Sequence, residues 1–556
     1  MAKPSGQEAR NIYARAVASA NAGDRTTAIK LFEQLIGSDA PQVQVRSALV
    51  RLNLDAHAWT QAADHMIALV PLIPSPAQLL ADAADTYSRA GAFDKAHETY
   101  EHLHRAMPDY ATGYFNHAYM LRTAHRFDEA LAYYDKALAH GIDGPEEVWL
   151  NKAVIYSDHL RDDGAAAACL ATALDIKADY VPALLNRANL YEEMSDRDGA
   201  RESYRRVVEL DPHNTTAVAR LINLDAGEVT SPIRTTAQKM ANHSGIQARA
   251  RSSLNFALGR DADARGDYDT AFEYFRMANE TAKPLGPAYD RAASETFTQD
   301  LITQFSKDWF NKLPVYSDAT PVFICGMFRS GSTLTEQVIA AHPDATPGGE
   351  LEYFIALATR ELAPFPAAVR GTKPDKMREM ARHYLQLLAK RFPGGGLITD
   401  KRPDNFLYIG LIKTLFPNAR FVHTTRDALD NCLSIYFLEL ADTLSYAKDL
   451  MDTGHFYAQQ VSLMSHWKTL FPDDIFTMSY DAFVADPRTQ AGKLLDFLGL
   501  EWNDACLEFH RLKNTVKTES YWQVRKPLYT QSSGRHLHYD THIKDLASYL
   551  KTEGLT

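Results

Sequence analysis

Small and apolar residues recur at a nearly fixed interval through the first half of the 556-residue chain. Six helix-like segments carry an alanine at the same place, at steps of 34 or 35 residues, and a second alanine series keeps the step in the preceding segments. Small residues at this spacing let two helices approach closely, so the pattern predicts a stack of helix–turn–helix units. The two series are Ala28, Ala62, Ala96, Ala130, Ala165 and Ala200, and Ala84, Ala118, Ala153 and Ala188.

This period and its small and bulky positions are typical of the tetratricopeptide repeat. Ala271 carries the pattern once more, 71 residues after Ala200, so one degenerate unit is predicted between them. We expect a repeat solenoid over residues 7–285 and a linker helix region over 286–317. Repeat arrays commonly present a concave binding surface, and we expect this one to bind a protein or peptide. The alternative is a spacer or a homodimer surface.

Short β-rich runs alternate with longer helical patterns in the rest of the chain. Such alternation predicts a parallel sheet covered by helices on both faces, with ligands at the carboxyl ends of the strands. The fold class predicted is therefore an all-α solenoid followed by a P-loop-like α/β domain over residues 318–556. The predicted strands are 321–325, 396–400, 419–425 and 474–480, and the predicted helices are 333–342, 373–391, 405–415, 429–440 and 487–499.

The composition is that of a soluble globular protein, with 46% hydrophobic and 23% charged residues. Its net charge of −11 argues against nucleic acid or an anionic membrane as a general partner. No segment reaches the about 18 uninterrupted apolar residues of a membrane span, and the N-terminus shows no signal-peptide core. The four cysteines lie far apart and form no C-x-x-C. We therefore expect a cytoplasmic protein with reduced thiols.

A glycine-rich turn, "GMFRSGST" (326–333), follows the first predicted strand and begins a helix. Backbone N–H groups in such a turn, together with the helix N-terminus, bind anions. A nucleotide triphosphate loop would carry Lys where this chain has Arg329 and its neighbours, and no clear acid for magnesium ends a strand. The loop therefore favours a nucleotide end without a triphosphate. A P-loop nucleotide kinase is the rival interpretation.

Arg426 follows the third predicted strand and supplies a second basic anchor. Ser434 comes eight residues later, roughly two turns along the next helix. Two anion sockets on one sheet suggest a nucleotide that carries phosphates at both ends of its ribose. The alternative for Arg426 is an ordinary salt bridge with Asp427 or Asp430.

The ordered set of motifs resembles the sulfotransferases that use 3′-phosphoadenosine 5′-phosphosulfate, most closely the tyrosylprotein sulfotransferases and bacterial proteins that fuse this domain to tetratricopeptide repeats. The resemblance covers about residues 320–537. It rests on "GMFRSGST", "GGE", "DKRPDNF", "LFPNARFVHTTRD", "YDAFVADP" and "SYWQVRKP…SGR".

The resemblance implies this phosphosulfate nucleotide as co-substrate and no metal. It assigns the 5′-phosphosulfate to the turn, the 3′-phosphate to the second anchor, and further nucleotide contacts to an aromatic residue and a basic residue. These residues are Arg329, Ser330, Gly331, Ser332 and Thr333 for the turn, Arg426 and Ser434 for the anchor, and Tyr480 and Arg535 for the further contacts.

The resemblance also implies three catalytic residues. Lys401 would stabilise the bridging oxygen of the leaving phosphate, with Ser520 assisting, and Glu350 would accept the proton of the acceptor hydroxyl. For Glu350 the alternative is an ordinary exposed acid at the start of a helix. His342 is the rival base, although its place before a proline also fits helix termination, and His423 fits packing inside a strand.

Three departures from the tyrosylprotein pattern leave the acceptor open. Arginines that read acidic peptides in that family are replaced by Glu352 and Ala356, and a further arginine by Leu438. The acceptor could thus be a protein tyrosine, another protein hydroxyl, a glycan or a small phenol. A repeat scaffold with an inactive sulfotransferase-like domain is the remaining alternative.

Overall fold

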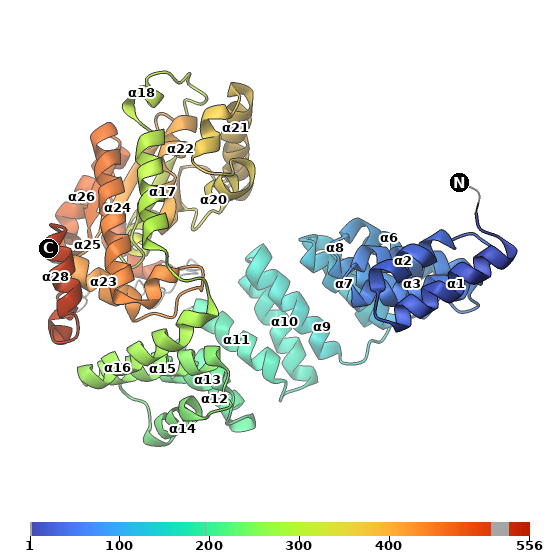
Figure 1. Cartoon of the computed structure of the whole chain (residues 1–556). Helices are drawn as coiled ribbons and strands as arrows, with labels where there is room; N and C mark the ends of the chain where they lie inside the picture. The colour runs from blue at the N-terminus through green and yellow to red at the C-terminus, as the bar shows by residue number, and fades with distance from the viewer. Residues whose placement is uncertain (1–2, 195, 513–532, 556) are drawn as a thin grey trace. The chain divides into compact units, whose positions relative to one another are not determined.

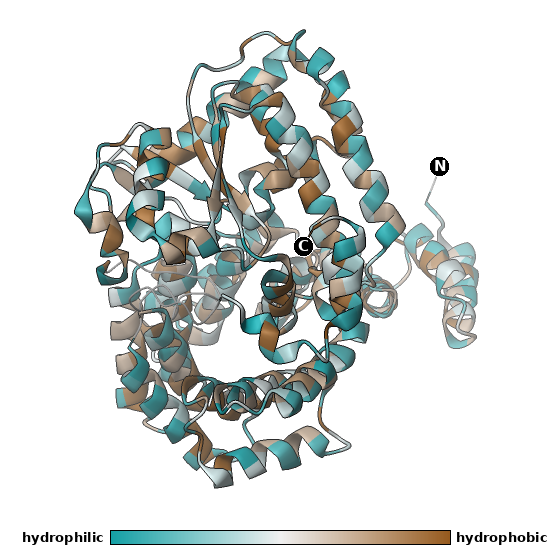
Figure 2. Cartoon of the chain, turned by 90° about the vertical axis from the view of Figure 1, so that its left-hand side faces the viewer, coloured by the Kyte–Doolittle hydropathy of each residue, from teal (hydrophilic) through white to brown (hydrophobic). Residues whose placement is uncertain are grey.

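The computed structural model describes residues 3–194, 196–512 and 533–555 (Figure 1). The chain divides into two compact units, Met1–Leu190 and Tyr191–Thr556. Single helices carry both hydrophobic and hydrophilic stretches, as expected for helices with one buried face (Figure 2). Across the described residues no helix combines the length and the apolar character that a membrane crossing requires.

The first unit consists of consecutive helices that pack as pairs. The predicted repeat alanines are buried between them, with one exception. In the fifth pair the buried residue is Ala166, not Ala165, because a π-helical turn, Ile155–Leu160, shifts the start of the following helix. The helices are α1 (Gly6–Asn21), α2 (Arg25–Gln34), α3 (Gln42–Asp55), α4 (Trp59–Leu69), α5 (Ala77–Arg89), α6 (Phe93–Ala106), α7 (Ala111–Thr123), α8 (Phe127–Ala139), α9 (Pro145–Val154), α10 (Asp163–Ile176) and α11 (Val181–Glu193), which extends past the division.

A chain of three imidazoles lies between α6 and α7. His117 is fully buried, and its two ring nitrogens lie 2.8 Å from His97 Nδ1 and 3.0 Å from His104 Nε2. Burial lowers the pKa of His117 to about 2 and that of His104 to about 4. Both rings are therefore neutral in the folded unit at ordinary pH.

The second unit begins with helices that continue the repeat pattern and then forms a five-stranded parallel sheet in the order β2-β3-β1-β4-β5. All four predicted strands are present, and the short β2 was not predicted. The strands are β1 (Val322–Gly326), β2 (Ala345–Pro347), β3 (Leu397–Lys401), β4 (Arg420–Thr425) and β5 (Ile475–Ser479). The helices are α12 (Arg197–Leu210), α13 (Thr215–Leu224), α14 (Ser231–Asn242), α15 (Ala248–Ala264), α16 (Tyr268–Ala282), α17 (Arg291–Gln304), α18 (Lys307–Phe310), α19 (Ser332–Ala340), α20 (Tyr353–Ala356), α21 (Pro374–Arg391), α22 (Ile409–Leu415), α23 (Ala428–Tyr436), α24 (Leu450–Leu470), α25 (Tyr480–Ala485), α26 (Pro487–Leu498) and α28 (Lys544–Thr552).

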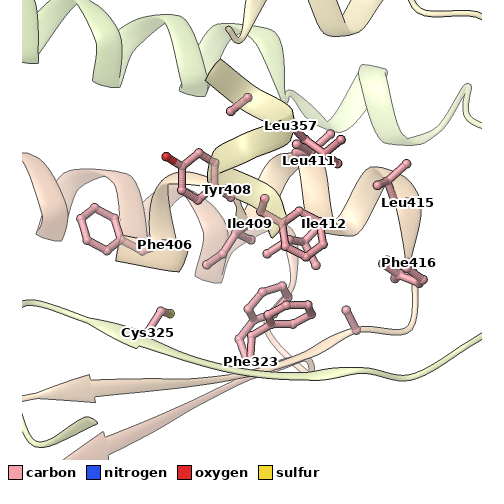
Figure 3. Close-up of a cluster of buried hydrophobic side chains, with 14 of the residues drawn as sticks. Phe323, Cys325, Leu357, Phe406, Tyr408, Ile409, Leu411, Ile412, Leu415 and Phe416 are labelled. Atoms are coloured by element: carbon pink, nitrogen blue, oxygen red, sulfur yellow. The ribbon is translucent and has the colours of Figure 1, made fainter. Parts of the chain in front are cut away.

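The two faces of the sheet bury different side chains because successive residues of a strand point to opposite faces. Phe323 and Phe421 belong to a core that includes α22 and α24, part of which Figure 3 shows around Phe323 and Ile412. Val422 belongs to a second core that includes α19 and α26. The sheet is therefore covered on both faces, as the alternation of strands and helices predicts.

The last repeat-like helix pair, α15 and α16, shares a core with α23 and the C-terminal helix α28. The ring of Phe275 stacks on that of Phe437 with 4.0 Å between centroids, and Asn279 donates to the backbone oxygen of Tyr436 at 2.8 Å. This pair thus belongs to the same compact unit as the sheet. The domain limits at 285 and 318 stay a prediction.

Candidate functional site

The glycine-rich turn joins the end of β1 to the start of α19. Gly326 has a φ of +152°, and an added Cβ would overlap the backbone oxygen of Thr424 on the neighbouring strand β4. Gly331 has a φ of +102° and immediately precedes α19, where the aromatic ring of Tyr480 would lie 3.1 Å from an added Cβ. Glycine is favoured at both places, because residues with a side chain rarely adopt these φ values and their Cβ would crowd the neighbouring atoms.

The predicted donors of the turn differ in what they offer to an anion. Ser332 and Thr333 begin α19, so their backbone N–H groups point out of the N-terminal end of the helix. Ser330 instead donates from its hydroxyl to Met327 O at 2.6 Å and lies 2.7 Å from the Thr424 hydroxyl. Its backbone N–H also bonds Met327 O, at 3.2 Å. Ser330 thus shapes the turn, and its predicted direct contact with the nucleotide stays a prediction.

The second anchor lies beside the turn. Arg329 Nε donates to the hydroxyl of Ser434 at 3.2 Å, and the Arg426 guanidinium lies 3.5 Å from the backbone oxygen of Arg329. The same guanidinium stacks over the ring of Tyr480, 5.1 Å from its centroid. Four residues predicted from three stretches of the sequence therefore meet near the ends of β1, β4 and β5.

Asp427 and Asp430, the alternative salt-bridge partners that the sequence suggests for Arg426, have other roles in the described structure. Asp427 caps α23 by accepting from the Asp430 backbone N–H at 2.9 Å. The buried carboxylate of Asp430 accepts from the backbone N–H groups of Gly534 at 2.6 Å and His536 at 2.8 Å. Asp481 accepts from Ser533 at 2.6 Å and from the Asp427 N–H at 2.8 Å. These carboxylates hold the turn after residue 532 against α23.

The predicted catalytic lysine and base form an ion pair on the other side of the turn. Lys401 Nζ lies 2.5 Å from Glu350 Oε1. The lysine side chain is 1% exposed, whereas that of Glu350 is 37% exposed. The backbone N–H of Lys401, at the end of β3, donates to Gly349 O at 2.9 Å, which holds the two residues in register.

A third acid lies beneath this pair and was missed by the sequence reasoning. Glu336 of α19 is buried and accepts from the Gly349 N–H at 3.0 Å and from Thr399 at 3.4 Å. Burial raises the pKa of Glu336, although the Lys401 charge acts in the opposite direction. The signal available was a charged residue on a helix that is otherwise uncharged, "STLTEQVIA".

Neighbouring charged residues in "DKRPD" serve the fold. Strand alternation turns Asp400 away from Lys401, and it accepts from Tyr384 at 3.1 Å and from Asn405 at 3.3 Å. Burial raises the pKa of Asp400 to about 7. Arg402 pairs with Asp404 at 2.7 Å.

Three further candidates lie outside this cluster or outside the described residues. His342 uses both ring nitrogens on backbone groups, Glu501 O at 3.0 Å and Asp344 N at 3.1 Å, so the rival base has a structural role. Arg535 pairs with Asp263 of α15 at 2.7 Å and lies over the ring of Phe437. Its predicted contact with the nucleotide stays a prediction, and Ser520 falls among residues 513–532, which the structure does not describe.

The order of the strands explains how these groups are brought together. β1 lies between β3 and β4, so the turn after β1 is flanked by Lys401 on one side and Arg426 on the other. The arrangement can hold an extended anion between two cationic groups and place a carboxylate beside it. It resembles a site for group transfer, with charge stabilised by fixed donors.

Comparison with known proteins agrees with this geometry. Residues 321–504 match the model of the sulfotransferase family, and residues 181–214 match that of the tetratricopeptide repeat. The chain thus combines a sulfotransferase-family domain with tetratricopeptide repeats. An uncharacterized protein of Aquifex aeolicus is 29% identical over 387 residues, which are 67% of this chain and 50% of that protein.

The relatives include a protein-tyrosine sulfotransferase of Drosophila melanogaster, 26% identical over 237 residues, which are 40% of this chain and 47% of that enzyme. The chain therefore spans about half the length of these two relatives. Among solved structures, the sulfotransferase domain of the Synechococcus PCC 7002 olefin synthase is 19% identical and covers 39% of this chain and 86% of its own, with a TM-score of 0.31.

Proposed function

We propose that the second unit is a sulfotransferase that moves a sulfuryl group from 3′-phosphoadenosine 5′-phosphosulfate to a hydroxyl or phenol acceptor. The observation that carries the proposal is the turn after β1, flanked by the Arg329–Arg426–Ser434 cluster and by the Lys401–Glu350 pair. Membership of residues 321–504 in the sulfotransferase family supports the same chemistry.

The cluster suits a nucleotide with two separate anionic groups. Backbone N–H groups of Ser332 and Thr333 would bind the 5′-phosphosulfate, together with Arg329. Arg426 and Ser434 would bind the 3′-phosphate. Tyr480 lies against both the turn and the Arg426 guanidinium, which supports a contact between its ring and the nucleotide.

The transfer step needs one acid-like donor and one base. The acceptor oxygen attacks sulfur in line, and the new sulfur–oxygen bond forms as the bond from sulfur to the bridging phosphate oxygen breaks. The electron pair of the broken bond goes to that oxygen, which Lys401 stabilises, and adenosine 3′,5′-bisphosphate leaves. The acceptor proton goes to Glu350. Fixed donors of this kind supply much of the rate of such reactions.

The resting ion pair connects these two roles. When the bridging oxygen of the donor binds the Lys401 ammonium, the Glu350 carboxylate loses part of its hydrogen bonding and becomes a better proton acceptor. Glu350 is the more exposed partner, so an acceptor hydroxyl can reach it.

The acceptor is a protein or another molecule that is not strongly acidic. Glu352 is exposed two residues after the base, where it repels a negatively charged peptide. The relatives that are protein-tyrosine sulfotransferases support a protein phenol among the candidates, and glycans and small phenols stay in the set to be tested. The repeats of the first unit would present a macromolecular acceptor or a partner.

Calorimetry with adenosine 3′,5′-bisphosphate tests the donor site. We expect micromolar binding, lost in Arg426→Ala and retained in the matched control Arg378→Ala, whose side chain is 52% exposed and pairs with an exposed acid. A radiolabelled sulfuryl donor offered with peptide and carbohydrate libraries then identifies the acceptor.

The rival functions give different results in the same experiments. A nucleotide kinase would bind ATP in the presence of magnesium and would not discriminate in favour of the bisphosphate. A scaffold with an inactive domain would show no heat with the bisphosphate and no labelled product.

A further inference from the structure

A cavity of about 420 Å³ lies between the end of β4 and one side of α24. Alternation along β4 turns His423 toward α24, as it does Phe421, while Val422 faces α19. Gln460, Met464 and Lys468 line the cavity at intervals of four residues, so one stripe of α24 forms its wall over about 12 Å. The cavity touches the predicted nucleotide site only at the end of β4 and the base of the turn.

The lining of this cavity is cationic. It includes Arg426 at the sheet end and Lys468 on α24, and no Asp or Glu among the described residues. Other lysines that are buried in this unit have carboxylate partners: Lys401 lies 2.5 Å from Glu350, and Lys413 lies 2.8 Å from Asp474.

Lys468 differs from those lysines in having no carboxylate partner. Its side chain is half-buried and makes no hydrogen bond or ion pair with the residues that the structure describes. Burial lowers the pKa of Lys468, which is the direction expected for a cation that lacks a counter-ion. Ser465 and Thr469, neighbours of Lys468 on the same helix, also line the cavity, and the Thr469 hydroxyl donates to Ser465 O at 2.9 Å.

A buried imidazole forms part of the cavity wall. His423 is 4% exposed, and its Nε2 lies 2.8 Å from the side-chain amide nitrogen of Gln460. With the amide donating, Nε2 is the acceptor and the ring proton lies on Nδ1. That Nδ1 finds no hydrogen-bond partner in the described parts of the chain. Because Nδ1 is itself inaccessible, His423 forms part of the cavity wall and is not counted among the groups that bind a ligand.

We propose that this cavity is a binding site for a small organic oxyanion, which carries a carboxylate, a sulfate or a phosphate group. The anionic group is held by Lys468 and the Ser465 hydroxyl, while the organic part lies along Met464 and Val461. The volume lies within the range of small-molecule sites, about 300–1,000 Å³. This site adjoins the predicted donor site at Ser330 and Arg426, and its anionic end at Lys468 does not depend on the proposed transfer reaction.

Crystals of the full chain soaked in selenate test the anionic end of the site. We expect an anomalous peak within hydrogen-bond distance of Lys468 Nζ, absent in Lys468→Met and present in Lys493→Met, which removes the same charge from an exposed position of α26. A Lys468→Gln variant, which keeps a polar end, serves if the methionine variant fails to fold. A peak that persists in both Lys468 variants, or no peak at Lys468 in the parent protein, overturns the proposal.

Solution binding tests the organic part and identifies the anionic group. Phenyl sulfate, phenyl phosphate and benzoate are titrated against the full chain saturated with adenosine 3′,5′-bisphosphate, so that the predicted nucleotide site is occupied. We expect at least one of them to bind, with affinity reduced about tenfold or more in Lys468→Met and unchanged in Lys493→Met. If the bisphosphate itself fails to bind, the same titration without it still tests the cavity. Binding of selenate alone, with none of the three organic anions, overturns the proposal of an organic ligand.

Discussion

Lys401 and Glu350 form an ion pair but are buried to different extents. We therefore expect replacement of Lys401 to change the free energy of unfolding less than replacement of Glu350 does. Lys401 is 1% exposed and Glu350 is 37% exposed. In Lys401→Met the carboxylate left behind can be rehydrated, and the neighbouring Glu336 can take up a proton more easily. We expect unfolding free energy to change by about 1 kcal/mol or less, because an apolar side chain of similar length replaces a buried charge.

Glu350→Ala leaves the buried ammonium without its nearest acceptor. A hydrogen bond to a charged group contributes about 1.5–3 kcal/mol, and breaking a fully buried pair costs about 3–5 kcal/mol. Water can reach the vacated place because Glu350 is partly exposed, so we expect a loss of about 2–3 kcal/mol. The exposed pair Lys376–Glu361, at 2.8 Å, is the matched control, and Lys376→Met should change neither stability nor rate.

For Lys401→Met we expect a large loss of turnover, although its stability changes little. Loss of one transition-state donor costs about 10²–10³-fold, or about 2.7–4 kcal/mol, so Lys401→Met should be a folded protein with a severe defect in turnover. Thermal unfolding measures the first quantity, and single-turnover transfer of a labelled sulfuryl group to a small phenol measures the second. The reasoning is refuted if Lys401→Met is as unstable as Glu350→Ala, or if its rate falls less than about tenfold while the bisphosphate affinity is unchanged.

Three other predictions follow from the described structure. Gly326→Ala should abolish binding of adenosine 3′,5′-bisphosphate in calorimetry, because its Cβ overlaps β4, whereas Gly492→Ala, with open space around the added Cβ, should bind normally. The pKa of His117 is held at about 2 against an ordinary value of 6.5, so below about pH 6.5 the unfolded chain takes up a proton that the folded unit does not. Stability should therefore fall as pH decreases from about 6.5, and His117→Asn should flatten this dependence in thermal melts; an unchanged slope would contradict the assignment. A chain beginning at residue 191 should be monodisperse in size-exclusion chromatography and should bind the bisphosphate. A chain beginning at residue 310 should aggregate, because it exposes the core shared by α16 and α23. Equal behaviour of the two chains would show that the helices between residues 191 and 310 are dispensable.

Local patterns in the sequence were enough to predict the four longer strands and the glycine-rich turn between β1 and α19. Buried strands of a parallel sheet are continuous apolar runs, and the turn carries its glycines and hydroxyls within eight residues. The short strand β2 was missed because Ala345–Pro347 is partly exposed and too short to form an apolar run. The alanine period failed only where a π-helical turn changed the spacing, which placed Ala166 at the buried position.

Tertiary contacts account for the rest of what the sequence reasoning missed. Glu336 and Asp430 are acids whose surroundings come from distant segments, so neither their burial nor their partners could be read from local spacing. Arg535 likewise meets Asp263, 272 residues earlier in the chain. The position of Arg426, by contrast, was predictable, because its place after a strand of a parallel sheet determines which edge it occupies.

One helix connects the repeat architecture to the chemistry. α23 carries Ser434 beside Arg329, and its other residues, including Leu433 and Tyr436, lie in the core built by α15 and α16. A different repeat pair at this place would reposition the helix that carries the serine. Repeat arrays can be exchanged between such proteins by natural recombination or by design of new specificities. The predicted anion site would stay intact only when the junction lies before this pair. A foreign array attached ahead of α11, which spans the division at residues 190 and 191, would leave this core and the predicted anion site unchanged.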